Sequence, residues 1–191
     1  MKKRVGVLIS GTGSNMKALV AASRQDDCTF EIACVVSNKP DAGGVAWARD
    51  HGLPAQVISH KDYATREAFD TAVDVYLQNK RLDVIACAGF MRIMTPVLIT
   101  PWSGRMLNIH PSLLPLYKGL HTHQRAIEAG DKEAGCTVHV VTTELDDGPI
   151  LAQARVPVLA GDTPETLAVR VLVEEHRIYP VALMAFCSSL K

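Results

Sequence analysis

The sequence predicts an α/β fold in which helices flank a mainly parallel, twisted sheet. Short apolar runs recur along the chain with stretches of helical periodicity between them, which is the pattern of βαβ units. Toward the C-terminus, two strand-like runs are joined by only six residues, 144–149. So short a connection can only join antiparallel neighbours. We therefore expect a Rossmann-like, three-layer fold whose sheet has an antiparallel hairpin at one edge.

The first half of the chain alternates between expected strands and helices. A glycine-rich turn at residues 11–13 ends the first strand and opens the first helix, and Gly52 stops the second helix. Residues 82–88 are a near-continuous apolar run, which suits a strand buried on both faces. The third helix is amphipathic, and its expected buried side is Ala68, Ala72, Val75 and Tyr76. The expected strands are 4–9, 32–37, 55–58 and 82–88, and the expected helices are 14–22, 44–51, 66–79 and 96–100.

The second half departs from this alternation. Pro111 cannot donate to a sheet ladder and favours an extended residue before it, so a central strand over 106–110 ends there. Thr163 or Asp162 caps a long closing helix. The expected elements are strands 106–110, 137–143 and 150–158 and helices 121–130 and 164–190.

Composition and charge restrict the class of protein. At 191 residues the chain is long enough for one domain with a substantial core. Lys plus Arg and Asp plus Glu both number 20, so the formal net charge is zero and nothing indicates a nucleic-acid or anionic-membrane partner. No apolar run approaches the roughly 18 residues that span a bilayer, and residues 5–9 are too short for a secretory core. Five cysteines, an odd number without a Cys-x-x-Cys pair, favour reduced thiols in the cytoplasm.

The central strand carries the strongest candidate for chemistry. Its alternation places Asn108 and His110 on one face and Leu107 and Ile109 on the other. Open α/β sheets bind their ligands at strand ends, and an amide donor beside a titratable ring suits oxyanion stabilisation and proton transfer. A pair of satisfied polar groups at a strand end is the alternative.

The turn at residues 11–15 resembles a phosphate site, because backbone N–H groups at a helix N-terminus attract anions. Met16 stands where a dinucleotide site has its third glycine, and residues 37–39 lack the acidic group that holds a ribose. Both absences favour a lone phosphate over NAD. A tight turn without a ligand remains the alternative.

A carboxylate near His110 would fix the tautomer of its ring, and two candidates follow the strand at 137–143. Asp146 and Asp147 are equally available on chemistry alone, and either could be a simple turn residue. His121 or His123 could also lie near the site. No His or Cys cluster has zinc spacing, and Ser112 has no activating arrangement, so we expect neither a metal site nor a serine hydrolase.

Six segments, taken together, resemble a known family: 8–15, 88–93, 107–115, 119–123, 144–146 and 175–180. They are similar to the phosphoribosylglycinamide formyltransferases, and the likeness covers residues 7–186. The resemblance implies one formyltransferase domain over 1–191, with the N-terminal part on the phosphate side and the C-terminal part on the folate side. It implies formyl transfer from 10-formyltetrahydrofolate to glycinamide ribonucleotide in de novo purine biosynthesis. The enzyme would be a cytoplasmic monomer or homodimer with these two small molecules as partners and no metal.

The resemblance also implies roles for individual residues. The positions that match the catalytic trio are Asn108, His110 and Asp146. Those that match the phosphate- and ribose-binding positions are Gly13, Ser14, Asn15 and Glu175. Those on the folate side are Arg66, Met91, Arg92, Ile93, Met94 and Asn108. One departure is Asp147, where the family commonly has glycine, which can alter the geometry of the loop or its affinity for folate.

Three other functions fit parts of this pattern. A formyltetrahydrofolate hydrolase shares the trio but carries an N-terminal module, for which a first strand at Arg4 is expected to leave no room. A methionyl-tRNA formyltransferase adds a C-terminal barrel, which we do not expect in a chain that stops at Lys191 without a basic surplus. A phosphate-ligand sensor would need only the turn at 11–15.

Overall fold

A seven-stranded sheet runs through the computed structural model, which describes residues 2–190. Its strand order is β3-β2-β1-β4-β5-β6-β7. The strands from β3 to β5 are parallel to one another, whereas β6 is antiparallel to both β5 and β7. The mixed sheet with an antiparallel edge is therefore confirmed. The strands are β1 Lys3–Ile9, β2 Phe30–Ser37, β3 Ala55–Val57, β4 Val84–Cys87, β5 Met106–His110, β6 Glu133–Val140 and β7 Ile150–Pro157.

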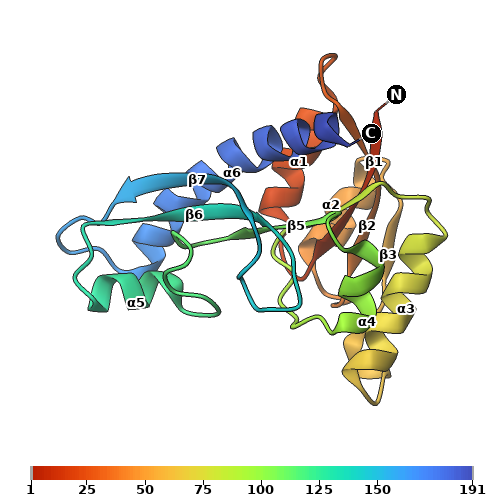
Figure 1. The fold of residues 1–191 in the computed structure, drawn as a ribbon, viewed down its shortest axis with the longest axis horizontal. Helices are drawn as coiled ribbons and strands as arrows, with labels where there is room; N and C mark the ends of the chain where they lie inside the picture. The colour runs from red at the N-terminus through yellow and green to blue at the C-terminus, as the bar shows by residue number, and fades with distance from the viewer. Residues whose placement is uncertain (1, 191) are drawn as a thin grey trace.

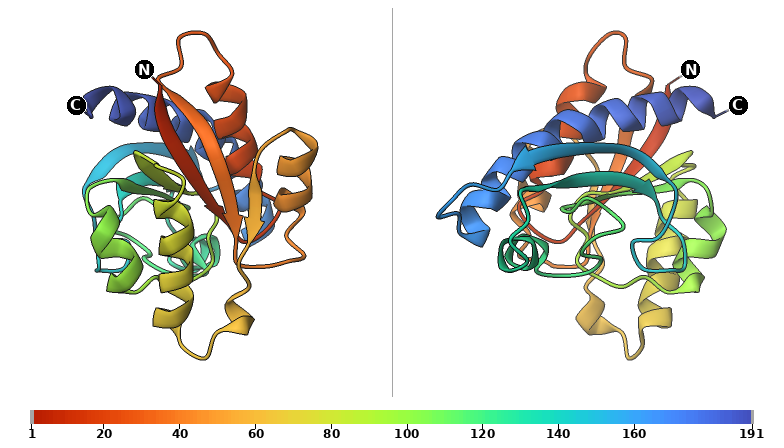
Figure 2. Two further views of the ribbon diagram at one scale, coloured as in Figure 1. Left: turned by 90° about the vertical axis from the view of Figure 1, so that its right-hand side faces the viewer. Right: turned by 60° about the vertical axis from the view of Figure 1, so that its left-hand side comes forward.

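Helices cover both faces of this sheet (Figures 1 and 2). One face packs against α1, α2, α5 and α6, and the other against α3 and α4. The helices are α1 Ser14–Ser23, α2 Gly43–Asp50, α3 Arg66–Gln78, α4 Pro96–Ile99, α5 Thr122–Glu128 and α6 Pro164–Ser189, with short 3₁₀ turns η1 His60–Asp62 and η2 Thr100–Trp102.

Side-chain alternation along the strands divides the apolar residues between two cores. In β5, Leu107 and Ile109 belong to the core under α1 and α6, whereas Met106 belongs to the core under α3 and α4. The period of two therefore places Asn108 and His110 on the α3/α4 face, as two polar residues at the end of a strand that is otherwise apolar.

The predicted helix over 66–79 is present, but its predicted buried side is wrong. The residues that α3 buries in the core are Phe69, Val73 and Leu77, spaced four apart, while Val75 is 55% exposed. Two stripes of α3 have helical spacing, and the one with the larger apolar side chains removes more surface from water.

Strand β6 begins and ends earlier than the sequence predicted, at Glu133 and Val140. Glu133 pairs with Pro157 of β7, so the hairpin partner sets where the strand begins. After Val140 the chain leaves the sheet, and residues 141–149 form a loop that returns over the face carrying Asn108.

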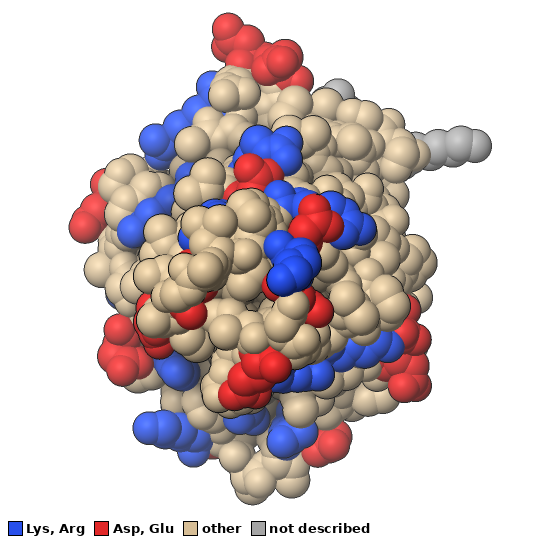
Figure 3. All heavy atoms as spheres, turned by 90° about the vertical axis from the view of Figure 1, so that its left-hand side faces the viewer, with Lys and Arg blue, Asp and Glu red and all other residues tan. Residues whose placement is uncertain are grey.

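Among residues 2–190, no helix combines the length and the apolar composition that a bilayer crossing requires. Figure 3 shows the face on the left of Figure 1, where Lys and Arg side chains are interspersed with Asp and Glu side chains. Neither sign of charge covers a continuous area of that face. All five cysteines are buried, and none of them forms a disulfide.

Candidate active site

A cleft of about 500 Å³ lies at the carboxyl end of β5 and is lined by residues of helices from both faces of the sheet. Its walls include residues 89–94, the end of β5, residues 119–123, the loop 141–146, and a pair contributed by α1 and α6, and Cys87, Ile99 and His139 also line it. Four large apolar side chains around it are more than half exposed: Met91, Ile93, Leu120 and Leu145. Apolar walls around a few convergent polar groups are typical of a small-molecule site.

His110 lies deep in this cleft, with 6% of its surface exposed. Its Nε2 is 2.9 Å from the carbonyl oxygen of Tyr117. Because a carbonyl oxygen can only accept, Nε2 carries a proton and donates it in this bond. On the other side of the ring, Nδ1 is 3.4 Å from Oδ2 of Asp146. Of the two ring nitrogens of His110, Nδ1 is therefore the one that can exchange a proton, and it lies next to the carboxylate of Asp146.

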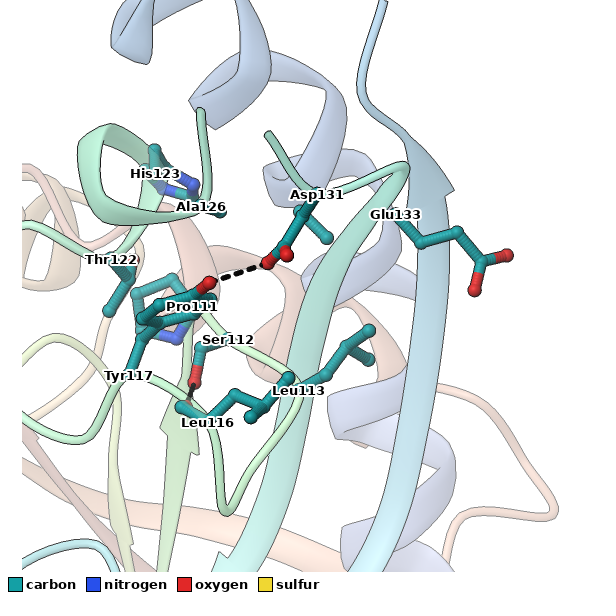
Figure 4. A pocket seen from close by; sticks show the side chains of 11 residues that line it. Pro111, Ser112, Leu113, Leu116, Tyr117, Thr122, His123, Ala126, Asp131 and Glu133 are labelled. Carbon is teal, nitrogen blue, oxygen red and sulfur yellow. Dashed lines mark hydrogen bonds between the residues drawn. The ribbon is translucent and has the colours of Figure 1, made fainter. Parts of the chain in front are cut away.

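The loop after β5 sets the position of the Tyr117 carbonyl. Thr137, on β6, donates its hydroxyl to the Ser112 carbonyl at 2.7 Å and accepts from the Leu114 N–H at 3.1 Å. At the far end of the loop, the Tyr117 hydroxyl donates to Asp131 at 2.6 Å. This bond borders a small cavity of about 10 Å³ (Figure 4). The loop is thus fixed at both ends.

Asp146, rather than Asp147, is the carboxylate beside His110. It has a φ of 49°, and its Oδ2 accepts from the Gly119 N–H at 2.9 Å. Asp147 is exposed and forms an ion pair with Lys118. The sequence could not separate these neighbours, because the choice depends on how the loop folds back over the sheet.

His139 is a member of this cluster to which sequence reasoning gave no role. It lies directly opposite Asn108 in the antiparallel pair of β5 and β6, and it is 2% exposed. Its Nε2 is 3.2 Å from Nδ2 of Asn108 and 3.7 Å from Oδ1 of Asp146. Burial lowers the pKa of His139. The only sequence signal was a polar residue in an apolar strand, because the register between β5 and β6 was not visible.

The other end of the cleft holds a buried polar pair from the first and last helices. Asn15 of α1 donates its side-chain N–H to Glu175 of α6 at 2.6 Å. Burial raises the pKa of Glu175, and the bond from Asn15 opposes this shift. Gly13 and Ser14 precede Asn15 at the start of α1 but do not line the cleft. Gly13 has a φ of 72°, which glycine adopts without steric cost.

The expected folate-side segment lines the cleft, and its ends are fixed by hydrogen bonds. The hydroxyl of Ser10 accepts from the Met91 N–H at 2.7 Å, and the carboxylate of Asp70 accepts from the Thr95 N–H at 2.6 Å. The expected folate-side residues that line the cleft are Met91, Arg92, Ile93, Met94 and Asn108. Arg66 is exposed at the start of α3 and lies outside the lining.

The sequence predicted only that His121 or His123 could lie near the site, and both of them line the cleft. Burial and the neighbouring His110 lower the pKa of His123. Within residues 2–190, no group of three or more His, Cys, Asp or Glu side chains is placed to hold a metal ion.

The arrangement combines two chemical capacities in the cleft, and a third lies beside it, at the start of α1, where Asn15 reaches the lining. Asn108 offers an amide N–H to a developing oxyanion. His110 can accept or donate a proton, and Asp146 stabilises the positive charge of its ring. The turn at the start of α1 offers backbone N–H groups to an anion. Such a set suits acyl-type transfer between two small molecules.

Comparisons with known proteins bear on this chemistry. Residues 3–183 match the family model for formyl transferase. A phosphoribosylglycinamide formyltransferase from Escherichia coli is 45% identical over 180 residues, which are 94% of this chain and 85% of that protein. The crystal structure of phosphoribosylglycinamide formyltransferase from Brucella melitensis has a TM-score of 0.94 and 53% identity, and the match covers 100% of this chain and 98% of that chain.

Some relatives are much longer than this chain. The trifunctional purine biosynthetic protein adenosine-3 of Bos taurus is 48% identical over 187 residues. That match covers 98% of this chain but only 18% of the bovine protein. The chain therefore corresponds to less than a fifth of the length of this relative.

Proposed function

The chain belongs to the formyl transferase family, and from this premise we propose that it transfers a formyl group from 10-formyltetrahydrofolate to the amine of glycinamide ribonucleotide. Membership of this family implies a folate cosubstrate. The products are formylglycinamide ribonucleotide and tetrahydrofolate, in de novo purine biosynthesis. The observation that carries the proposal is that Asn108, His110 and Asp146 meet in the same cleft as the Asn15–Glu175 pair.

The first step is attack of the substrate amine on the formyl carbon. Negative charge then grows on the formyl oxygen, and a side-chain N–H of Asn108 donates to it. The loss of one such donor typically costs roughly 3 to 4 kcal/mol of transition-state stabilisation. Asn108 lies on a strand rather than on a loop, which holds its amide in place without reorganisation during the reaction.

The second requirement is movement of a proton. The attacking amine loses one proton, and N10 of the folate gains one when its bond to the formyl carbon breaks. His110 has its Nε2 proton committed to the Tyr117 carbonyl, so Nδ1 is the atom that carries the exchanged proton. Asp146, 3.4 Å from Nδ1, stabilises the protonated ring between the two transfers. General acid–base transfer of this kind contributes roughly 10²- to 10⁴-fold.

The proposal extends to the binding groups, the domain and the partners. The groups that bind the substrate phosphate and ribose are Gly13, Ser14, Asn15 and Glu175. The groups that bind the folate are Arg66, Met91, Arg92, Ile93, Met94 and Asn108. Residues 1–191 act as one formyltransferase domain, as a monomer or homodimer in the cytoplasm. The partners are the two small molecules, with no metal, nucleic acid or membrane.

The test is a steady-state assay of purified protein with both substrates, following release of tetrahydrofolate. We expect His110→Ala and Asp146→Asn to lower kcat roughly 10²- to 10⁴-fold with little change in either KM. The matched control is Asp147→Asn, which removes an exposed carboxylate one position away and should leave kcat within about twofold.

Two results would contradict the proposal in different ways. Folate release that does not require the amine would identify water as the formyl acceptor, as in a hydrolase. Tight nucleotide binding without any release would identify a sensor.

A further inference from the structure

We propose that His139 is a positioning residue, which orients the side-chain amide of Asn108 so that an N–H group, and not the carbonyl oxygen, faces the reacting formyl oxygen. The inference rests on the proposed function, because it concerns the donor to the oxyanion of that reaction. It adds to the three expected catalytic groups a fourth residue that acts through one of them.

Hydrogen bonding and burial together fix the tautomer of His139. Its Nδ1 is 3.0 Å from the carbonyl oxygen of Val140, the next residue in β6. A carbonyl oxygen can only accept, so Nδ1 carries the proton. Burial lowers the pKa of His139, although the Val140 carbonyl and the carboxylate of Asp146 partly oppose the shift. The ring is therefore neutral at neutral pH, and Nε2 has a free lone pair.

The side-chain amide of Asn108 lies against this lone pair. The bare Nε2 of His139 is an acceptor, and the side-chain nitrogen of Asn108 lies 3.2 Å from it. A flipped amide would place its oxygen against this lone pair, so that two acceptors would face each other. The ring therefore selects one of the two amide orientations. One N–H of the amide is bound by His139, and the second remains for a ligand in the cleft.

Strand pairing holds both residues in place. Asn108 and His139 are direct partners in the antiparallel pairing of β5 and β6, so their side chains lie on the same face of the sheet. Neither residue depends on a loop for its place. Asp146 is also 3.7 Å from Nε2 of His139, beyond hydrogen-bond distance, and the amide nitrogen of Asn108 is closer. The strand register thus determines which partner the ring takes.

The test compares two substitutions of the same length. His139→Gln keeps an acceptor, its side-chain oxygen, near the place of Nε2, whereas His139→Met fills similar space without a comparable acceptor. We expect His139→Met to lower kcat roughly tenfold to a hundredfold, less than complete loss of an oxyanion donor, with both KM values nearly unchanged. His139→Gln should recover most of that loss. Thermal melting of both variants shows whether the fold is retained.

A double-mutant cycle separates this role from a general structural one. In an Asn108→Ala background, His139→Met should lower kcat no further, because no amide is left to orient. ¹⁵N spectra of the imidazole of His139 in the wild-type protein should report a protonated Nδ1 and a bare Nε2 at neutral pH.

The outcomes separate the two proposals. A wild-type protein that does not transfer formyl groups would end the proposed function. An active wild type would instead overturn the role of His139 under any of three results: His139→Met with full kcat, equal losses for Met and Gln, or an undiminished loss in the Asn108→Ala background. A protonated Nε2 would overturn it on the spectrum alone.

Discussion

Thr137→Val tests whether the loop after β5 is held by one buried hydroxyl. Thr137 is fully buried, and valine reproduces its shape without the oxygen. The hydroxyl donates to the Ser112 carbonyl at 2.7 Å and accepts from the Leu114 N–H at 3.1 Å and the Gln153 amide at 2.9 Å. The Gln153 amide keeps a second bond, to the Leu114 carbonyl at 2.8 Å. The substitution therefore mainly orphans two buried backbone groups.

Each buried group left without a partner costs roughly 1 to 3 kcal/mol. Because a carbonyl tolerates this better than an N–H, we expect a loss of about 2 to 4 kcal/mol in the free energy of unfolding. For a chain of this size, 1 kcal/mol shifts Tm by roughly 2 to 4 °C, so Tm should fall by roughly 4 to 16 °C. Thr137→Ser is the matched control, because it keeps the hydroxyl and loses one methyl group, at about 1 kcal/mol.

Calorimetry and urea unfolding measure both variants against the wild type. The distinguishing result is that valine, the closer match in shape, destabilises more than serine. We also expect a lower kcat for Thr137→Val, since the same loop places the Tyr117 carbonyl against His110. If Thr137→Val were as stable as the wild type, or if Thr137→Ser were the less stable of the two variants, the hydroxyl would not be the feature that holds the loop.

Three further predictions concern other parts of the site and core. Burial raises the pKa of Glu175, so its contribution to stability is full below the ordinary value of 4.5 and is lost as pH rises through the raised value. Glu175→Gln should thus melt above the wild type at about pH 8 but not at about pH 4, and equal melting at both would contradict this. Gly148→Ala places a Cβ 1.7 Å from the Val140 carbonyl oxygen, so the loop must shift. We expect about 1 to 3 kcal/mol of destabilisation, and a lower kcat because Asp146 moves with the loop. Wild-type stability together with wild-type kcat would refute the steric argument. The buried hydroxyl of Tyr179 has one proton, which it shares between backbone carbonyls of β4 and β5 at 3.0 and 3.3 Å. Tyr179→Phe should therefore cost about 1 to 2 kcal/mol in urea unfolding with kcat unchanged, and a loss under about 0.3 kcal/mol would argue against this bond.

Local chemistry explains what the sequence could predict. The glycine at position 13 adopts a positive φ, Pro111 directly follows the last residue of β5, and Thr163 caps α6 as expected. Each of these depends on one residue and its immediate neighbours. The alternation that separates Asn108 and His110 from their apolar neighbours is also local, because a strand has a fixed period.

The parts that the sequence could not predict depend on contacts between distant segments. Asp146 and Asp147 are indistinguishable until the loop folds back over β5 and one of them meets His110. His139 gains its place from the register of β5 with β6, which no local pattern encodes. In α3, two stripes compete, and only the packing against the sheet shows that Phe69 marks the buried one.

The pair of Asn15 and Glu175 has a consequence for how the protein is made. Its two members are 160 positions apart, on the first and the last helix. While the chain emerges from the ribosome, this wall of the cleft is missing until α6 follows. The wall of the cleft that Asn15 and Glu175 form is therefore complete only when α6 packs against α1, a contact between segments far apart in the sequence.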